Sequence, residues 1–252
     1  MRLTVTLLAA ALGLCCQAAR ADGLADLKSA LARLQEQAPL KATLDTKTWR
    51  RQGEGQEAEE TRGQASVGIE DGAQGMHLSY GKDILARMDA ESLALARNPN
   101  ARTPTLNAAR EFSPNDLRPM ISAAASLARV LEKASWKNEK ADTCQGKPAR
   151  LLTFDVAIDT LSDRDRKYVK EFDGHLYVWI GDDGTPLASR MVQNMSGRAF
   201  IVIRFEARNE EQQVYALVGE RLVSVRRESY NRASGAGERE ENRVVKTLQL
   251  QS

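Results

Sequence analysis

Residues 174–227 read GHLYVWIGDDGTPLASRMVQNMSGRAFIVIRFEARNEEQQVYALVGERLVSVRR, and they indicate the fold class more directly than any other segment. Three runs rich in β-branched and aromatic residues, at 176–180, 198–207 and 214–218, alternate with turn residues. Asp183-Gly184 between two such runs is a strong short-range hairpin signal, because glycine adopts the positive φ angle that tight hairpin turns require. This stretch therefore predicts an antiparallel β-meander.

Helical periodicity appears on the N-terminal side of the meander. In Gly23–Gln37 the leucines are spaced by three and four residues, which places them on one helical face: Leu24, Leu27, Leu31 and Leu34. Asp83–Arg97 is also predicted as a helix, and a third helix begins at the Ser113 N-cap, with Pro114 in its first position, and continues to about Ala134. Residues 98–112 contain two prolines and are predicted as a linker.

Together these elements predict an α+β fold: a curved antiparallel sheet (half-barrel, β-meander) covered by an N-terminal helix and a central helical insertion at residues 83–137. The polar segment Glu228–Val244 is predicted as a long hairpin tip, and Val244–Leu250 as the last strand. The length suits one domain at residues 22–252, preceded by a signal peptide at residues 1–21.

The N-terminus has the features of a secretory signal peptide. Arg2 precedes the apolar segment Leu3–Cys16, and Ala19-Arg20-Ala21 matches an A-x-A cleavage site, so we expect cleavage after Ala21 and a location in the periplasm. A transmembrane anchor would need about twenty apolar residues, and this run is shorter, so no transmembrane anchor is expected after cleavage. Cys15-Cys16 leaves a lipid-anchored envelope protein as the alternative, although Leu14 stands where a small residue is usual.

Charge and cysteine content narrow the function classes. Of 36 Lys and Arg, two (Arg2 and Arg20) lie in the signal peptide, so 34 basic residues balance 34 acidic residues in the remainder. A chain without net charge has no general attraction for nucleic acid, and no nucleic-acid partner is expected. Only Cys144 remains after cleavage, so an intramolecular disulfide is excluded; a reactive or intermolecular role for this thiol stays open beside that of a loop or partly buried thiol.

Residues with catalytic or metal-binding chemistry are sparse. The two histidines, His77 and His175, with Cys144 supply too few closely spaced donors for a transition-metal site. The chain has no G-x-S-x-G elbow, P-loop or dinucleotide fingerprint. We therefore expect no catalytic residues, no metal and no cofactor, and a protein that is not an enzyme. A histidine beside a carboxylate in a cleft would favour an enzyme instead.

The order of elements resembles a known architecture. A signal peptide, an amphipathic helix with leucines at 24, 27, 31 and 34, the strand start Leu40-Lys-Ala-Thr-Leu44 and long antiparallel strands are similar to the periplasmic lipoprotein carriers and receptors of the LolA/LolB type. The resemblance covers most of residues 22–252, and the helical segment Asp83–Ala134 departs from it. It implies an incomplete, strongly curved barrel covered by helices, with apolar space between them that binds acyl chains.

The leading hypothesis is a non-enzymatic periplasmic binding protein that holds an acyl chain or another apolar small molecule. Curved sheets with helical covers enclose concave apolar space, where ligands usually bind. The residues expected to line this pocket are Leu44, Met120, Leu127, Phe154, Trp179, Ile201, Phe205 and Leu217. The alternative is a structural or interaction module with a filled core that docks another envelope protein, because strand aromatics also fill cores. An enzyme is the third hypothesis.

Overall fold

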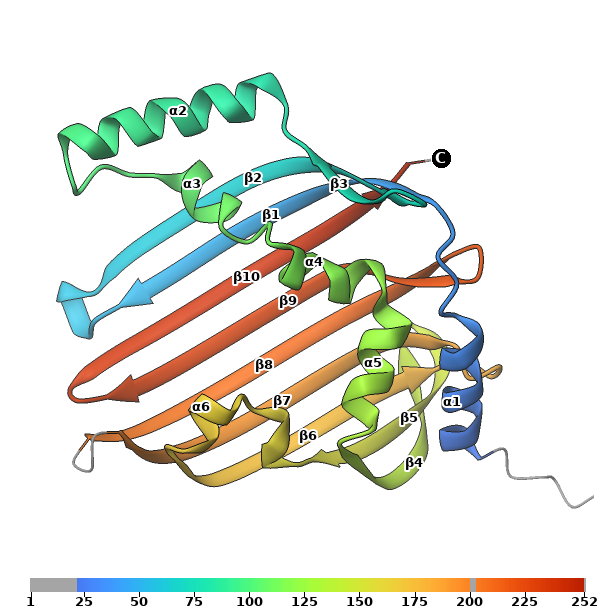
Figure 1. The fold of residues 1–252 in the computed structure, drawn as a ribbon. Helices are drawn as coiled ribbons and strands as arrows, with labels where there is room; N and C mark the ends of the chain where they lie inside the picture. The colour runs from blue at the N-terminus through green and yellow to red at the C-terminus, as the bar shows by residue number, and fades with distance from the viewer. Residues whose placement is uncertain (1–21, 200–202, 252) are drawn as a thin grey trace, which may run out of the picture.

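The computed structural model describes residues 22–199 and 203–251, which build one ten-stranded sheet (Figure 1). The strands lie in the order β3-β2-β1-β10-β9-β8-β7-β6-β5-β4, and neighbours are antiparallel. Because β3 and β4 form the two edges, the sheet is open and does not close into a barrel. The predicted α+β class and antiparallel meander are confirmed. The strands are β1 (Leu40–Gln52), β2 (Glu59–Gly72), β3 (Gly75–Ser79), β4 (Ala134–Cys144), β5 (Lys147–Val156), β6 (Val169–Ile180), β7 (Pro186–Ala199), β8 (Ile203–Val218), β9 (Arg221–Gly235) and β10 (Glu238–Leu250).

Most helices lie on one face of this sheet. Those present are α1 (Gly23–Arg33), α2 (Lys82–Arg97), α3 (Pro104–Ala109), α4 (Pro114–Ile121), α5 (Ala123–Leu131) and α6 (Asp163–Arg166), with single 3-10 turns η1 (Gly55–Glu57) and η2 (Ile158–Thr160). In Figure 1, α3, α4, α5 and α1 cross the same face, and each contacts strands beneath it. We call this the helix-bearing face and the other side the opposite face.

Two helical predictions need correction. The helix predicted from Ser113 to Ala134 is broken at Ser122, whose φ of −128° and ψ of 56° end α4 and begin α5. This break lets α4 contact β9 while α5 packs against α1. The predicted linker at residues 98–112 contains α3, whose first amides donate to the Glu91 carboxylate of α2 over N–O distances of 3.0 and 2.9 Å. Such an acceptor satisfies amides that a helix start leaves unpaired.

The predicted hairpin tip at Glu228–Val244 is also wrong. Strand β9 continues to Gly235 and β10 begins at Glu238, so only Ala236 and Gly237, both at positive φ, form the turn. Side chains on both faces of these strands are polar because this end of the sheet extends beyond the helices (Figure 1). Backbone pairing supports strands there without an alternating apolar pattern.

The core consists of two apolar clusters on the helix-bearing face. The first packs α1 and α5 onto β5 and β6, with Leu27, Leu31, Leu127, Phe154 and Val178 among its buried residues. The second packs α3 and α4 onto β1 and β2; its members include Leu44, Val67, Leu117, Met120 and Leu248. The helical insertion thus contacts both halves of the sheet, through α5 beside α1 in the first cluster and through α3 and α4 in the second.

One buried arginine connects these halves. Arg221 begins β9 and is 2% exposed. Its Nε donates to the Ile121 carbonyl at the end of α4, and its Nη1 donates to the Ala38 carbonyl before β1, both over 2.7 Å. Its Nη2 forms an ion pair with Asp71 of β2. The guanidinium therefore fixes α4 and the α1–β1 connection to the sheet.

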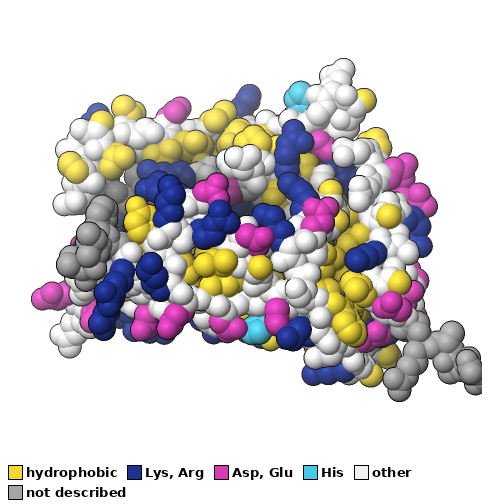
Figure 2. All heavy atoms as spheres, turned by 60° about the horizontal axis from the view of Figure 1, so that its bottom comes forward, with side chains coloured by type: hydrophobic (Ala, Val, Ile, Leu, Met, Phe, Trp, Pro, Cys, Tyr) yellow, Lys and Arg dark blue, Asp and Glu magenta, His cyan; other side chains and the backbone are white. Residues whose placement is uncertain are grey.

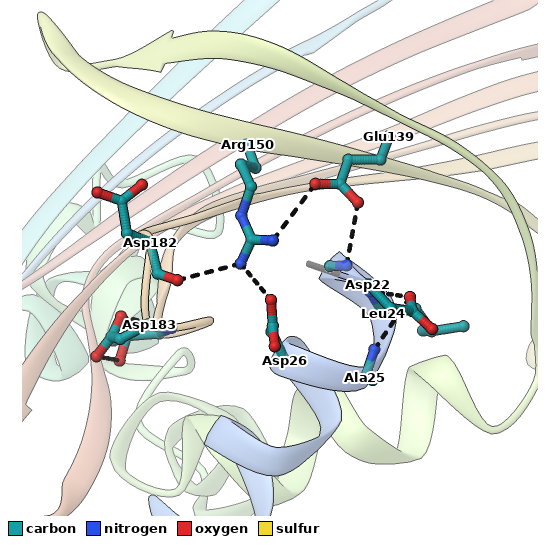
Figure 3. Close-up of polar contacts among 10 residues, drawn as sticks. Asp22, Leu24, Ala25, Asp26, Glu139, Arg150, Asp182 and Asp183 are labelled. Carbon is teal, nitrogen blue, oxygen red and sulfur yellow. Dashed lines mark hydrogen bonds and ion pairs between the residues drawn. The ribbon is translucent and has the colours of Figure 1, made fainter. Parts of the chain in front are cut away.

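A second arginine attaches α1 to the sheet edge (Figure 3). Arg150 of β5 places Nη2 2.7 Å from the Asp26 carboxylate of α1 and Nη1 3.5 Å from that of Glu139 in β4. Glu139 also accepts the Gly23 amide at 3.0 Å, at the N-terminus of α1. The nearby turn glycine, Gly184, has a φ of 80°, and a Cβ there would lie 2.4 Å from the Asp26 carbonyl oxygen. Helix α1 thus rests directly on the β6–β7 turn.

Replacing Arg150 with methionine is expected to lower the free energy of unfolding by about 2–3 kcal/mol, because two partly buried carboxylates lose their shared cation. The matched control is Arg166→Met, which removes an exposed ion pair with Asp163 and should change stability by less than about 0.5 kcal/mol. Urea unfolding followed by circular dichroism measures both. Equal losses in the two variants would contradict a special role for Arg150.

Candidate functional site

A row of polar side chains crosses the middle of the helix-bearing face. Five neighbouring strands contribute one residue each, and each residue is paired in register with the next: Thr46 (β1), Lys246 (β10), Arg227 (β9), Gln213 (β8) and Ser189 (β7). We call these five residues the polar row. At both ends the row continues into the apolar clusters, through Ala65 on β2 and Val178 on β6. Polar and apolar side chains are therefore adjacent on the helix-bearing face.

The two cations of the polar row are held by carboxylates. Lys246 is 4% exposed, and its Nζ lies 3.1 Å from the carboxylate of Glu111, between α3 and α4. Arg227 donates from Nε to Glu211 over 2.9 Å and from Nη1 to the Asp116 carbonyl of α4 over 3.2 Å. Both contacts tie the insertion to the sheet. The pairs also balance their charges, as buried ions require.

Two atoms of the polar row have unused hydrogen-bonding capacity. Thr46 is fully buried, and neither its Oγ1 nor the Oε1 of Gln213 has a hydrogen-bond partner within the described residues. The amide nitrogen of Gln213 does donate to Glu211, over 2.7 Å. A buried polar atom without a partner costs about 1–3 kcal/mol. The row thus offers a hydroxyl and a carbonyl oxygen to a polar group that reaches it.

The end of the row beside the first cluster contains a buried hydroxyl pair. Ser189 Oγ lies 2.6 Å from the hydroxyl of Tyr215, in β8. Burial raises the pKa of Tyr215 far above its ordinary value, and the hydrogen bond with Ser189 lowers it only in part. Tyr215 therefore stays neutral and serves as a hydrogen-bonding group within the apolar cluster.

The structure separates the residues predicted to line an apolar pocket. Leu44 and Met120 are buried in the second cluster, whereas Leu127 and Phe154 are buried in the first. These four residues are packed against helices and strands of their own cluster. They lie in the two clusters at opposite ends of the polar row, not around one common space.

The other four predicted pocket residues lie elsewhere. Strand alternation places Trp179 on the opposite face, where its Nε1 donates to Asp142 over 3.1 Å. Phe205 lies on the helix-bearing face near the open end of β8, half-buried, and Leu217 is 48% exposed near the other end of that strand. Ile201 falls outside the described residues.

His175 has the carboxylate neighbours that an enzyme would require. On the opposite face its Nδ1 lies 3.2 Å from Asp155 and its Nε2 lies 2.9 Å from Asp173. Lys137 holds the pKa of Asp155 below its usual value, since it hydrogen-bonds to that carboxylate. The ring also lies near Tyr177. Both ring nitrogens therefore face carboxylate acceptors, an arrangement that orients the ring.

Within the residues described, no three His, Cys, Asp or Glu side chains are placed to hold a metal ion. Across the same residues, no helix combines the length and apolar character needed to cross a membrane.

Sequence reasoning missed the polar row, although one signal was available. In Val244-Val-Lys-Thr-Leu-Gln-Leu250, the inward positions Val244 and Leu248 flank Lys246. A lysine at a position that alternation predicts to be buried indicates a paired or functional cation. The partner of Lys246, Glu111, is far away in the sequence, so only the fold reveals the pair.

Tyr215 should be the last of the five tyrosines to ionise, because burial penalises its charged form and so raises its pKa. Because the folded protein favours neutral Tyr215, the contribution of this residue to the free energy of unfolding is complete below the ordinary tyrosine pKa and is lost as pH rises above it. Ultraviolet titration of the native protein should show one tyrosine that ionises only with alkaline unfolding, and this step should be absent from Tyr215→Phe. An unchanged titration curve in the variant would contradict the assignment.

Comparisons with models of protein families, with curated proteins and with solved structures find no match for this chain. The resemblance to carriers of the LolA/LolB type therefore stays a prediction from the order of elements.

Proposed function

We propose that this protein is a non-enzymatic binding protein of the periplasm that holds an amphipathic ligand on its helix-bearing face. The observation that carries the proposal is the polar row, which crosses five strands between two apolar clusters. In a ligand with an acyl chain and a polar head group, the chain would contact an apolar cluster and the head group would contact the polar row. In this role the sheet acts as the curved half-barrel of a carrier, and α4 and α5 form its cover.

The cover is suited to displacement. Helices α4 and α5 have 8 and 9 residues and are separated by the break at Ser122. Helices this short have little stability of their own, so their position depends on packing. Small side chains, Ala123 and Ala124, face the core from α5. Moving these helices would expose apolar strand residues to an acyl chain while the ten-stranded ladder stays paired.

The head group would meet the polar row. Lys246 and Arg227 supply cationic donors, and the unpartnered Thr46 hydroxyl and Gln213 carbonyl oxygen supply further hydrogen-bonding positions. An acyl chain alone would leave these atoms unsatisfied in the interior, at a cost in free energy. A phospholipid or lipidated peptide therefore fits better than a purely apolar molecule.

The decisive experiment is native mass spectrometry of residues 22–252 purified from the periplasm under mild conditions, followed by analysis of extracted lipid. The expected result is a bound mass that resolves into an amphiphile with at least one acyl chain. A protein free of ligand that also fails to bind a fluorescent fatty-acid probe would contradict the proposal. Recovery from the periplasm tests the predicted export and cleavage after Ala21.

Thr46→Val separates a binding role from a structural one. Removing an unpartnered buried hydroxyl should raise the free energy of unfolding by about 1 kcal/mol, whereas loss of a head-group contact should weaken probe binding severalfold. The control is Thr48→Val, on the same strand and face but half-buried and outside the polar row. Greater stability with unchanged affinity for an acyl phosphate probe would show that Thr46 does not touch the ligand.

A second candidate function, an envelope interaction module, is favoured by helix α2. Its helical contacts are with α3, and among its residues only Ile84 is buried. Leu93 is 61% exposed and Leu85 is 46% exposed; Figure 2 shows hydrophobic side chains at the surface over this helix, at the upper left. If mass spectrometry finds protein without lipid, this helix becomes the principal candidate for contact with another envelope protein.

A further inference from the structure

The opposite face of the sheet carries a hollow that the proposed function does not use. Its volume is about 530 Å³, and its lining comes from β1, β8, β9 and β10: Trp49, Glu210, Gln212, Glu228, Tyr230, Glu241 and Arg243. Four of these form one continuous row across the sheet, since Trp49 pairs with Arg243, Arg243 with Tyr230, and Tyr230 with Glu210. This size lies within the range of small-molecule sites.

Two aromatic side chains border the hollow. Trp49 and Tyr230 lie on either side of Arg243, two strand spacings apart, or about 10 Å. Both are half-buried, so part of each ring remains accessible. The Trp49 indole donates to Glu60 over 3.3 Å, and the Tyr230 hydroxyl donates to Glu241 over 2.7 Å. The rings are thus held in place, and each keeps accessible apolar surface on its side of Arg243.

The carboxylates of the hollow are already neutralised. Arg243 Nε and Arg226 Nη2 donate to Glu228 over 2.8 and 2.9 Å. Arg239 Nε donates to Glu241 over 2.9 Å. With each carboxylate matched by a guanidinium, the hollow has no surplus negative charge to attract a metal ion or amine.

Glu210 is held in the same way. Arg190 Nε donates to it over 2.8 Å, Gln212 over 2.9 Å, and Arg208 Nη2 over 3.3 Å. Burial raises the pKa of Glu210, but these hydrogen bonds outweigh that effect and keep its pKa below the ordinary value. The carboxylate is therefore ionised at neutral pH and remains a strong acceptor.

Paired carboxylates and guanidiniums are well suited to hydrogen-bond with hydroxyl groups. A carboxylate has about four lone-pair sites and a guanidinium has five N–H donors, so each pair offers acceptor and donor positions beside one another. A hydroxyl group is both a donor and an acceptor, and it can use both positions at once. Several hydroxyls on a ring with apolar C–H faces would satisfy the Glu–Arg pairs and the aromatic walls together.

We propose that this hollow binds a saccharide, with Trp49 and Tyr230 against the sugar ring and the Glu–Arg pairs bound to its hydroxyls. A second hollow of about 460 Å³ is lined by β6, β7, β8 and β9, and Asn194, Arg208 and Arg232 are among its lining residues. The Arg208–Glu210 ion pair joins the two hollows. Room for more than one ring makes an oligosaccharide the expected ligand. This site is independent of amphiphile binding on the helix-bearing face.

The test is saturation-transfer NMR and calorimetry of residues 22–252 with chitotriose and maltotriose as probes. Saturable binding of at least one probe is expected, and Trp49→Ala and Tyr230→Ala should each weaken it by about tenfold or more. Trp136→Ala is the control, because Trp136 is 46% exposed on edge strand β4, outside the hollow. It should leave affinity unchanged.

Tyr230→Phe is a milder variant in case Tyr230→Ala fails to fold, because it keeps the aromatic ring and removes only the hydroxyl. It should fold normally and weaken binding severalfold. Absence of saturable binding of both trisaccharides at millimolar concentration would overturn the proposal. So would binding that survives Trp49→Ala and Tyr230→Ala at full affinity in folded protein.

Discussion

The buried guanidinium of Arg221 is the contact on which the arrangement of the helices depends. Its partners come from three separate segments: the Ala38 carbonyl before β1, the Ile121 carbonyl at the end of α4, and the Asp71 carboxylate of β2. A charge that is 2% exposed is tolerable only if its donors are satisfied. The carbonyl groups at a helix C-terminus also favour a cation. These demands fix where α4 meets the sheet, and hence where the two apolar clusters are divided.

The sheet itself depends on a different interaction, the backbone ladder. At one end, helices pack on apolar side chains; at the other, β9 and β10 run past the helices with mainly polar side chains on both faces. Asn209, Asn231 and Asn242 are paired across this open end of the helix-bearing face. Hydrogen bonds between strands join backbone groups and do not depend on side-chain polarity. The strands therefore stay paired at the open end, where the apolar alternation is absent.

Strand alternation lets the same three strands serve two surfaces. In β9, Arg227 points toward the helices, whereas Arg226 and Glu228 point to the opposite face. In β8, Gln213 belongs to the polar row and Gln212 to the hollow. The two proposed sites therefore lie back to back, separated by one layer of backbone. A ligand on either side can bind without contact with the other, although both sites rely on the same register.

Local patterns in the chain were sufficient to predict the antiparallel meander, the leucine face of α1 and the α+β class, because apolar periodicity and turn glycines are local signals. Helical periodicity runs through Ser122, where α4 ends and beyond which α5 packs against α1, and it is lacking in the polar strands around Gly235, so neither feature was predicted. The predicted lining residues were chosen as apolar residues alone, and the fold placed those among the described residues in two clusters and on two faces. Only the tertiary structure brings together residues about 130 to 190 positions apart in the chain: packing of the insertion joins Glu111 to Lys246, and strand register joins Trp49 to Arg243.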